Sequence, residues 1–464
     1  MSRPMQTSPD SSNTSASADS GARSVAGARK VSGWRTPGGI LLLALLWFAS
    51  AVLASHFSSP SGMPPAVWPP TGIALAALLM FGARLWPGVL IGALGAFLYL
   101  GEPLALAVAR AIAHVAEMLV GYSLLRRVGF QLSLRRVQDI LHLVTMGGIL
   151  APLLGMLILA AFVNLVPGAL AEYRNFWARM QILWFSDALG ILIFTPLLLA
   201  WAHVRSVRTS LRGTLEAIAL GISIVVAGWA SFSWVGTPHA ASYPFIIFPF
   251  IIWAGLRFSH CGASTASLLV ATIAISGTIN NWGVFAWPIS PNSALLALQA
   301  FLAIATVTGL ILASTAVERR DSLATLQDSE SRYRTLFEKN PQPMLVYRLG
   351  SGEIKDANQS AHQRFGYQSP EFHARTLDDL VEPGIPRSDM GELLGMSTGE
   401  TLRKKLVVLG ASGEKVLCDC TAQCVVFSGE KAGLLIAEDV TEQEQTREAL
   451  HDLEQKLTLH MQQT

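Results

Sequence analysis

The twelve residues from Leu310 to Asp321, LILASTAVERRD, separate two parts of the sequence that differ sharply in composition. Residues 36–316 hold only 18 charged residues among 281, and the charged residues that follow Leu310 return at ordinary density. Soluble domains have about 25% charged residues, whereas this chain of 464 residues is 14% charged and 51% hydrophobic. The composition excludes a single soluble globular domain. It predicts a membrane-embedded block followed by a soluble tail.

Ten apolar segments of the first part approach the length of about 20 residues that a helix needs to cross a bilayer. They are residues 39–58, 66–82, 85–100, 103–125, 139–165, 179–203, 214–235, 241–256, 260–280 and 293–316. The second, third and eighth are short or contain proline, so eight or nine spans are an alternative. We therefore predict a polytopic α-helical bundle of about ten spans over residues 36–318. The Ser-, Ala- and Gly-rich segment 1–35 is expected to be disordered.

Arginine and lysine are distributed unevenly between the loops of this ten-span arrangement. With a cytoplasmic N-terminus, the inner loops hold sixteen of these residues and the outer loops hold two, Arg174 and Arg179. Short loops rich in positive charge stay in the cytoplasm, so both termini are predicted to be cytoplasmic. A net charge of +2, with no basic run away from the membrane flanks, excludes nucleic acid as an expected partner and leaves membrane lipid.

Four ionisable residues lie well inside predicted spans, away from the span ends, where each costs roughly 2.5–3.5 kcal/mol on insertion scales. Arg110, His114 and Glu117 share the fourth span at spacings i, i+4 and i+7, which places them on one helical face. Asp187 lies in the sixth span. One interpretation is a pocket that binds a small-molecule ligand or an ion. The other is an internal ion pair, in which Arg110 and Glu117 neutralise each other through His114. A chain of carboxylates would also suit a proton-coupled transporter.

The segment from Trp68 to Gly72, WPPTG, places two prolines and a glycine at the start of an apolar segment. Such a sequence interrupts helix geometry at membrane depth, which is tolerated only against protein or a water-filled cavity. We therefore expect a discontinuous helix here and place Trp68 among the candidate ligand-binding residues. The other tryptophans near span ends, Trp47 among them, are predicted to be interfacial anchors.

The order of several short motifs in this block resembles the first type of membrane-associated sensor (MASE) domain. The motifs are residues 68–74 (WPPTGIA), 81–88 (FGARLWPG), 92–93 (GA), Glu117 with 124–127 (LLRR), 187–190 (DALG) with Pro196, and 298–301 (LQAF) leading to Glu318-Arg319. The resemblance covers about residues 38–320. It implies an integral sensory domain in the inner membrane of bacteria that serves histidine kinases or cyclic-di-GMP enzymes. The family's ligands are mostly undefined.

The soluble tail begins with a helix and continues with alternating strand and turn signals. Neither glycine nor proline occurs from Leu310 to Asn340, so one helix can run without interruption from the last span into a linker, residues 319–338. Strands are predicted at 344–349, 354–357, 402–409, 415–427 and 432–438, with short helices across 359–396. This order predicts an antiparallel sheet in an α+β domain. Near-heptad apolar residues in the linker suit either a homodimer or packing on the domain itself.

The tail resembles a PAS domain over residues 329–443. The matching residues are 331–337 (SRYRTLF), Asn358 after the second strand, 365–367 (FGY) and 439–442 (DVTE). The resemblance implies a cytoplasmic input module that can hold haem, flavin or a small metabolite, and it makes Asn358 a candidate ligand-binding residue. Haem at a PAS histidine is not expected, because no histidine occurs between His373 and His451. A flavin photoadduct is not expected either, because the Asn-Cys-Arg-Phe motif is missing. The cofactor is therefore unknown.

Three of the four cysteines, Cys418, Cys420 and Cys424, lie in one predicted strand. Strand alternation places them on one face with Val416, Ala422 and Val426. A second cysteine pair is absent, so no metal site is predicted. We expect these thiols to face the core, with redox sensing as the alternative.

The chain continues after Glu442 as a charged helix, residues 444–464, with leucines at coiled-coil spacing. No catalytic motif is recognised, so the chain is not expected to be an enzyme. The leading hypothesis is a sensory protein that relays a stimulus from the membrane domain and the PAS module to a separate output protein, a kinase or a cyclic-di-GMP enzyme. The alternatives are a PAS-regulated transporter or transceptor, and a diguanylate cyclase or histidine kinase shortened at its C-terminus.

Overall fold

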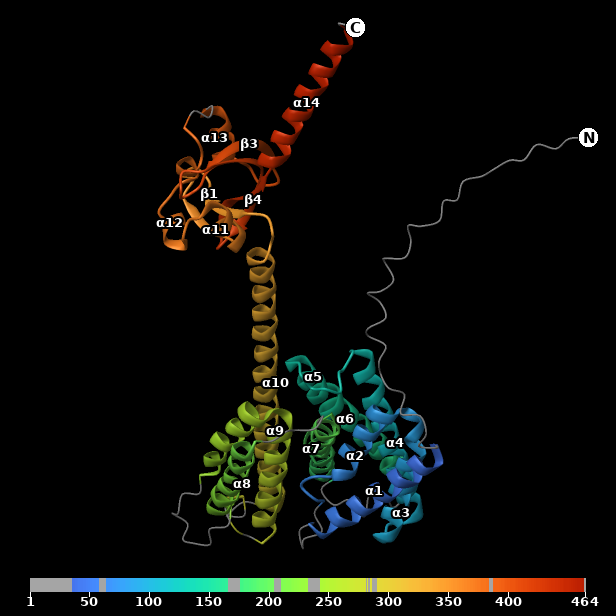
Figure 1. Ribbon diagram of the computed structural model, residues 1–464. Coiled ribbons are helices and arrows are strands. Elements are labelled where there is room, and N and C mark those ends of the chain that lie inside the picture. The colour runs from blue at the N-terminus through green and yellow to red at the C-terminus, as the bar shows by residue number, and fades with distance from the viewer. Residues whose placement is uncertain are drawn as a thin grey trace, which may run out of the picture. The chain divides into compact units, whose positions relative to one another are not determined.

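The computed structural model describes residues 36–57, 64–165, 176–203, 210–232, 243–280, 282, 284–285, 290–383 and 387–462 (Figure 1). The chain forms two compact units, which meet in sequence between Asp321 and Ser322. We call the first the helical unit and the second the sheet unit. The segment 1–35 lies outside the described residues, and so does its predicted disorder.

The helical unit consists of apolar helices joined by short connections. Its elements are α1 (Thr36–His56), α2 (Pro69–Phe81), η1 (Ala83–Leu85), α3 (Trp86–Tyr99), α4 (Leu104–Arg127), α5 (Val137–His142), η2 (Leu143–Leu150), α6 (Ala151–Leu165), α7 (Phe176–His203), α8 (Leu211–Phe232), η4 (Pro244–Ile247), α9 (Phe248–Ile279) and the first part of α10 (Pro291–Glu338), which continues into the sheet unit. Within the described residues, seven helical stretches are long and apolar enough to cross a membrane, and α2 and α3 are shorter apolar helices. The prediction of a polytopic helical block is confirmed, with an approximate span count.

The helix α9 explains part of the difference between ten predicted segments and seven long helices. A straight helix of its 32 residues would be about 48 Å long. However, the ring of Phe248 at its start contacts the ring of Phe301, which packs on Phe232, and Gly277 near its end lies against the backbone of Phe232. The chain therefore reverses at Ser259, where φ is 58° and ψ is −150°. The reversal falls between the predicted segments 241–256 and 260–280.

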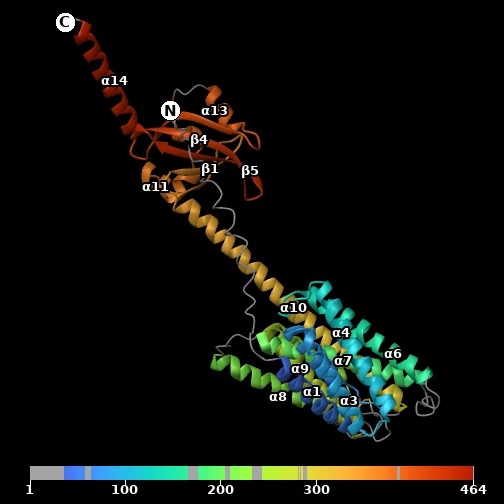
Figure 2. The ribbon, with the colours of Figure 1, turned by 90° about the vertical axis from the view of Figure 1, so that its right-hand side faces the viewer.

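Close helix crossings hold the helical unit together, and the tightest joins α2 to α7. A Cβ added to Gly72 would lie 2.0 Å from the carbonyl oxygen of Gly190, and a Cβ added to Gly190 would lie 1.9 Å from the carbonyl oxygen of Trp68. Small residues allow two helix backbones to approach closely within a membrane. The helices α1 and α3, and α4 and α6, also pack side by side (Figure 2).

The helix α10 is continuous from Pro291 to Glu338, which confirms the predicted unbroken helix across the sequence boundary at Leu310–Asp321. Its buried Gln299 donates to the backbone carbonyls of Ala66 and Ile182, at 3.0 and 3.1 Å. Further along, the Ser314 hydroxyl lies 2.9 Å from Nε2 of His260, just after the reversal in α9. These contacts bind α10 to the segment before α2, to α7 and to α9.

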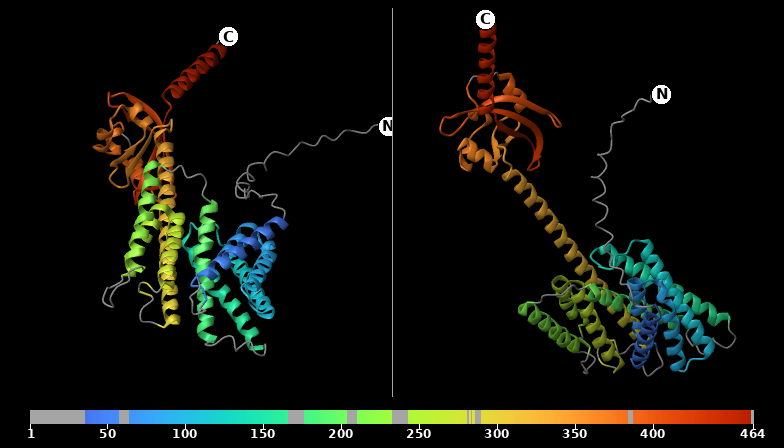
Figure 3. Two further views of the ribbon diagram at one scale, coloured as in Figure 1. Left: turned by 90° about the horizontal axis from the view of Figure 1, so that it is seen from below. Right: turned by 45° about the vertical axis from the view of Figure 1, so that its right-hand side comes forward.

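The sheet unit is an antiparallel five-stranded sheet with the strand order β2-β1-β5-β4-β3 (Figure 3). The strands are β1 (Met344–Arg348), β2 (Ile354–Ala357), β3 (Thr401–Leu409), β4 (Lys415–Phe427) and β5 (Glu430–Asp439). The helices are α11 (Gln359–Phe365), α12 (Ser369–His373), η5 (Leu377–Leu380), α13 (Arg387–Leu394) and α14 (Thr441–Gln462). The predicted α+β fold and all five strands are confirmed, each within about two residues at either end.

The two faces of the sheet are covered differently. The helices between β2 and β3 pack on one face and form the main core of the unit with residues such as Phe365, Phe372 and Leu380. On the other face, Phe337 from the end of α10 packs against Val346 and Ala432. Phe337 therefore fits the expectation that part of the linker packs on its own domain.

Candidate functional site

A cavity of about 560 Å³ opens among the ends of several helices in the helical unit. Its walls come from the end of α1, the segment before α2, the loop between α3 and α4, the first half of α4, α6 and the first half of α7. Five of the six predicted ligand-binding residues line it, namely Trp68, Arg110, His114, Glu117 and Asp187. We call it the acidic cavity. Its volume falls in the range of small-molecule sites.

The helix α4 supplies three of these side chains from one face, as the spacing predicted. The imidazole Nδ1 of His114 lies 3.3 Å from Oε2 of Glu117, and both side chains are buried. Arg110 pairs with Glu102 from the loop before α4 and lies over the ring of Phe97, 4.0 Å from its centroid. The alternative interpretation, in which Arg110 and Glu117 neutralise each other, is therefore wrong, because Arg110 pairs with Glu102.

The crossing of α2 and α7 brings Trp68 and Asp187 to the same cavity. The backbone N–H of Trp68 donates to the carbonyl oxygen of Ser186 at 3.0 Å. The Thr71 hydroxyl lies 2.8 Å from the carbonyl oxygen of Trp68 and 3.1 Å from that of Asp187. Pro69 begins α2, and the residues before it are not helical. The prediction of a discontinuous helix is therefore wrong for the described residues, because the two prolines begin α2 and do not interrupt a helix.

Aromatic rings pack on one side of these charged side chains. For one of them, Trp47, the sequence predicted a position at the membrane interface. Trp47 is completely buried, and its ring contacts those of Trp68, Phe97 and His114 edge-on at centroid distances of 5.6–6.0 Å. The rings of Phe97 and His114 are stacked, with centroids 5.7 Å apart. The prediction that Trp47 is an interfacial anchor is wrong, because its helix turns this side chain inward.

Several polar atoms around the acidic cavity have no hydrogen-bond partner among the described residues. They are Oε1 of Glu117, Oε2 of Glu102, and the indole Nε1 atoms of Trp47 and Trp68. A buried polar atom without a partner costs about 1–3 kcal/mol, and a charged one costs more. This cost points to a binding site, in which a bound polar or cationic group supplies the missing partners.

The cavity also contains charged residues that sequence reasoning missed. Glu102 is the only acidic residue between Thr36 and Arg110, and this isolation at the end of an apolar segment was a usable signal. Arg179 lines the cavity from α7. Phe97 gave no signal, because an aromatic residue in an apolar helix is ordinary.

The sixth candidate, Asn358, has a structural position in the sheet unit. Its Oδ1 accepts from the backbone N–H groups of Met344 and Ala361, both at 2.9 Å, and so caps α11. Its Nδ2 donates to the carbonyl oxygens of Phe337 and Gln342, at 3.1 and 2.9 Å. These bonds occupy the whole amide. The structure therefore gives no support to the predicted ligand-binding role of Asn358 and assigns it the junction between α10 and the sheet.

The three cysteines of β4 face the main core of the sheet unit, as strand alternation predicted. Cys418, Cys420 and Cys424 are buried, and burial raises the pKa of Cys418 to about 12 and also raises that of Cys420. A thiol with a raised pKa is a poor nucleophile, which argues against redox sensing. Val426, near the end of β4, is 74% exposed.

Comparison with known proteins gives two family matches. The MASE1 model matches residues 38–320, and a PAS domain model matches residues 331–398. No curated protein matches the chain. Among solved structures, the PAS domain of an HTR-like protein from Haloarcula marismortui is 24% identical, with a TM-score of 0.24, and covers 26% of this chain and 98% of its own.

A second solved structure, the PAS domain of BvgS from Bordetella pertussis, is 23% identical, with a TM-score of 0.21, and covers 28% of this chain and 98% of its own. The MASE1 match spans the helical unit and more than half of the chain, and the PAS match begins the sheet unit. The chain therefore belongs to the MASE1 family and is a membrane sensory protein with an attached PAS domain.

Proposed function

We propose that the acidic cavity receives the stimulus and that α10 carries the response to the sheet unit. The observation that carries this proposal is the cavity itself, where buried charged and aromatic side chains meet and several polar atoms have no hydrogen-bond partner within the described part of the chain. Intramembrane ionisable groups are functional candidates because keeping them there is costly. A ligand that pairs with them would stabilise one arrangement of the surrounding helices over another.

The cavity would face the outside of the inner membrane. Its walls come from the ends of α1 and α3 and the starts of α4 and α7, and the arginine and lysine distribution predicts that these ends are outside. The same distribution places both termini in the cytoplasm. An alkaline phosphatase fused after Gly101 should then be active and one fused after Arg320 inactive. Activity of the second fusion would overturn this orientation.

Gln299 connects the cavity walls to α10. It donates to Ala66, two residues before Trp68, and to Ile182, five residues before Asp187. The two segments that shape the cavity therefore share one buried contact on α10. A shift of either segment would alter this contact, and α10 continues to Phe337, which packs on the sheet.

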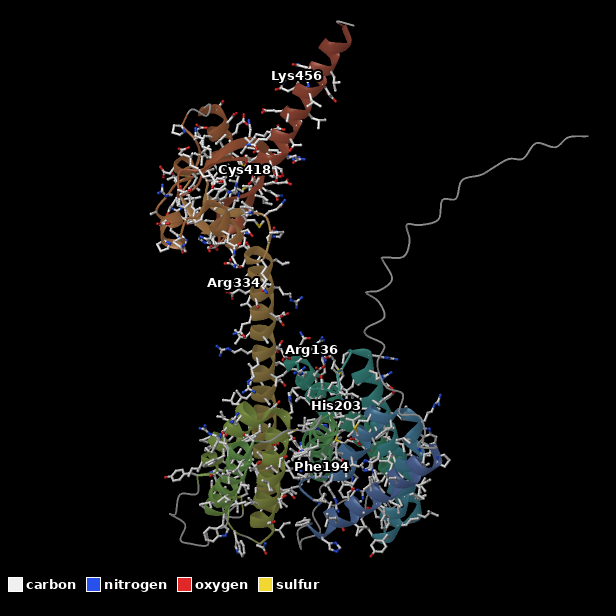
Figure 4. All side chains as sticks on the ribbon, viewed as in Figure 1. Arg136, Phe194, His203, Arg334, Cys418 and Lys456 are labelled. Carbon is white, nitrogen blue, oxygen red and sulfur yellow. The ribbon has the colours of Figure 1, made fainter. Side chains whose placement is uncertain are left out.

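The response would reach a separate output protein, a kinase or a cyclic-di-GMP enzyme, through a homodimer. Leu323, Leu326 and Tyr333 on α10 are at least half exposed within the single chain, which suits pairing with a second copy. Arg334 and Lys456 project from α10 and α14 (Figure 4). We propose no catalytic step within this chain. A disulfide between two chains of Leu326→Cys, with none in Asp328→Cys on another face of α10, would support the homodimer.

A glycine substitution tests the sensory role without knowledge of the stimulus. A Cβ on Gly155 would lie 3.0 Å from Oε2 of Glu117, so Gly155→Leu should fill part of the cavity and displace that carboxylate. Gly221, on α8, faces open space and makes Gly221→Leu a matched control. We expect Gly155→Leu alone to change hydrogen exchange across residues 322–357 of the full chain in lipid nanodiscs. Equal exchange in both variants would contradict the proposal.

A transporter would behave differently in the same chain. If the carboxylates of the acidic cavity moved a substrate or protons, proteoliposomes would accumulate substrate and Asp187→Asn would abolish the accumulation. A sensor gives no net accumulation with either form, even where its ligand binds. Accumulation that depends on Asp187 would replace the sensory proposal with transport.

A further inference from the structure

We propose that the acidic cavity holds a divalent transition-metal cation, bound by His114, Glu117 and Asp187. This inference rests on the proposed function, because it names the chemical class of the ligand in the same cavity. It differs from the sequence-based expectation, in which spacing alone predicted no metal site. Cysteine spacing was the signal considered there, whereas these three ligands come from two helices far apart in the sequence.

The three side chains already form most of a coordination sphere. One ligand atom of each residue lies within 4.8 Å of those of the other two, and Nδ1 of His114 is 3.3 Å from Oε2 of Glu117. Ligands bound to one metal at about 2.0–2.2 Å lie about 3–3.5 Å apart. The His114–Glu117 pair therefore has the required separation. Asp187 lines the open cavity and needs to approach by only about 1 Å to complete the set.

A second observation points to a missing cation. Glu117 is 1% exposed, and its Oε1 has no hydrogen-bond partner among the described residues. A buried carboxylate is normally paired with a cation or coordinates a metal. Glu117 and Asp187 also approach each other within the cluster, which is unfavourable for two carboxylates without a cation between them.

The nearby basic residue does not supply that cation. Arg110 points to Glu102 and lies on the Phe97 ring, so its positive charge is already paired. Arg179 is the other basic residue in the cavity wall. With a neutral imidazole, the acidic cavity has three carboxylates and two guanidinium groups, which leaves a net charge of −1 for a cation to balance.

The donor set favours a particular class of metal. One imidazole nitrogen and two carboxylates suit zinc and neighbouring first-row metals, whereas Ca²⁺ and Mg²⁺ prefer oxygen ligands throughout. Histidine and glutamate at positions i and i+3 of one helix can both reach one ion, as in helical-bundle metal sites. Three protein ligands leave a coordination position open toward the cavity, which a water molecule or an external ligand can fill.

Metal binding to the full chain tests this inference. The untagged protein in lipid nanodiscs is stripped with EDTA and titrated with Zn²⁺ or Mn²⁺, and the bound metal is counted by mass spectrometry. We expect one Zn²⁺ per chain and at least about 100-fold weaker binding of Ca²⁺. Asp187→Asn, Glu117→Gln and His114→Ala should each weaken Zn²⁺ binding by at least about 100-fold, since even outer-shell changes cost 10–100-fold.

Two control variants distinguish metal coordination from a general effect of removing a negative charge. Glu102→Gln removes a carboxylate from the same cavity, and we expect less than a tenfold loss of Zn²⁺ affinity because Glu102 is not a ligand. Glu216→Gln removes an ion-paired carboxylate elsewhere on the helical unit and should change nothing. An equal loss in Glu102→Gln and Asp187→Asn would overturn specific coordination.

X-ray absorption of the Zn²⁺-loaded wild type gives a test that does not depend on any variant folding. One imidazole with oxygen ligands supports the site, and sulfur ligands or several imidazoles overturn it. Absence of stoichiometric Zn²⁺ or Mn²⁺ binding also overturns it. In that case the effect of Gly155→Leu on exchange in residues 322–357 still decides the sensory role separately.

Discussion

The helical unit and the sheet unit treat their buried polar groups in opposite ways. Seven buried side-chain atoms of the described residues lack a hydrogen-bond partner, and all seven belong to the helical unit. In the sheet unit, the buried amide of Asn358 uses both its acceptor and its donor groups, and the buried Tyr347 hydroxyl donates to Leu393 at 2.9 Å. Within the described residues, the buried polar side chains of the sheet unit all have hydrogen-bond partners, whereas several of those in the helical unit do not.

In the proposed account, this difference separates residues that stabilise the fold from residues that respond to a stimulus. A satisfied buried network favours one structure. An unsatisfied cluster costs stability and persists where it serves function. Three of the seven atoms belong to residues that line the acidic cavity, namely Trp68, Glu102 and Glu117, and a fourth belongs to Trp47, whose ring packs against Trp68 and His114.

The largest contrast is expected in thiol reactivity. Because burial holds the pKa of Cys418 at about 12, its thiolate fraction at pH 8 is about 10³-fold below that of a free cysteine. Maleimide should therefore label none of the three β4 cysteines in the native chain, and at most the partly exposed Cys261 of α9. Mass spectrometry after denaturation in SDS should find four labels. Rapid native labelling of the β4 cysteines would refute their burial in the core.

Asn358→Ala should destabilise the sheet unit substantially. It removes the cap of α11 and the side-chain hydrogen bonds to Met344, Phe337 and Gln342, which together costs about 3 kcal/mol. Chemical unfolding followed by far-ultraviolet circular dichroism measures the loss. The matched control is Gln359→Ala, at the exposed neighbouring position. It should change the free energy of unfolding by less than about 0.5 kcal/mol, as is usual for surface substitutions.

Glu117→Gln, in the helical unit, should instead raise the free energy of unfolding. The substitution keeps the shape of the side chain and removes an uncompensated buried charge, so metal-free protein should be stabilised by about 1 kcal/mol. Thermal unfolding in detergent measures this, with the ion-paired Glu216→Gln as the control. A loss of more than about 1 kcal/mol in Glu117→Gln would show that Glu117 is already satisfied and stabilising.

The smallest effect is expected at the start of α14. Burial acts to raise the pKa of Asp439, but hydrogen bonds from Thr441 and Arg364 outweigh it and lower the pKa. A pKa lowered by folding stabilises the domain above the unfolded value of about 3.9, and this gain disappears as pH falls through the folded pKa. Asp439→Asn should therefore cost about 1 kcal/mol at pH 7 and nothing near pH 2. A pH-independent loss would exclude the ionic contribution.

Local patterns predicted the parts of the molecule that depend on local geometry. The spacing of Arg110, His114 and Glu117 placed them on one face of α4, and alternation placed the β4 cysteines in the core. All five strands followed from turn signals and β-propensity. These features depend on residues within one helix or one strand, and a single sequence contains them.

Long-range packing explains what the sequence could not provide. The approach of Asp187 to Trp68 depends on Gly72 and Gly190 at the crossing of α2 and α7, and no local pattern pairs these two glycines. The inward orientation of Trp47 was missed because position near a span end favours an interfacial role.

The most direct test of the account combines a substitution in the acidic cavity with an interruption of α10. Two glycines inserted after Arg320 should interrupt α10, since glycine is unfavourable within helices by roughly 1 kcal/mol each. In lipid nanodiscs, Gly155→Leu should change hydrogen exchange in residues 322–357, and the insertion should abolish that change while both proteins stay folded. A change that persists through the interrupted helix, or never occurs, would contradict transmission from the acidic cavity along α10.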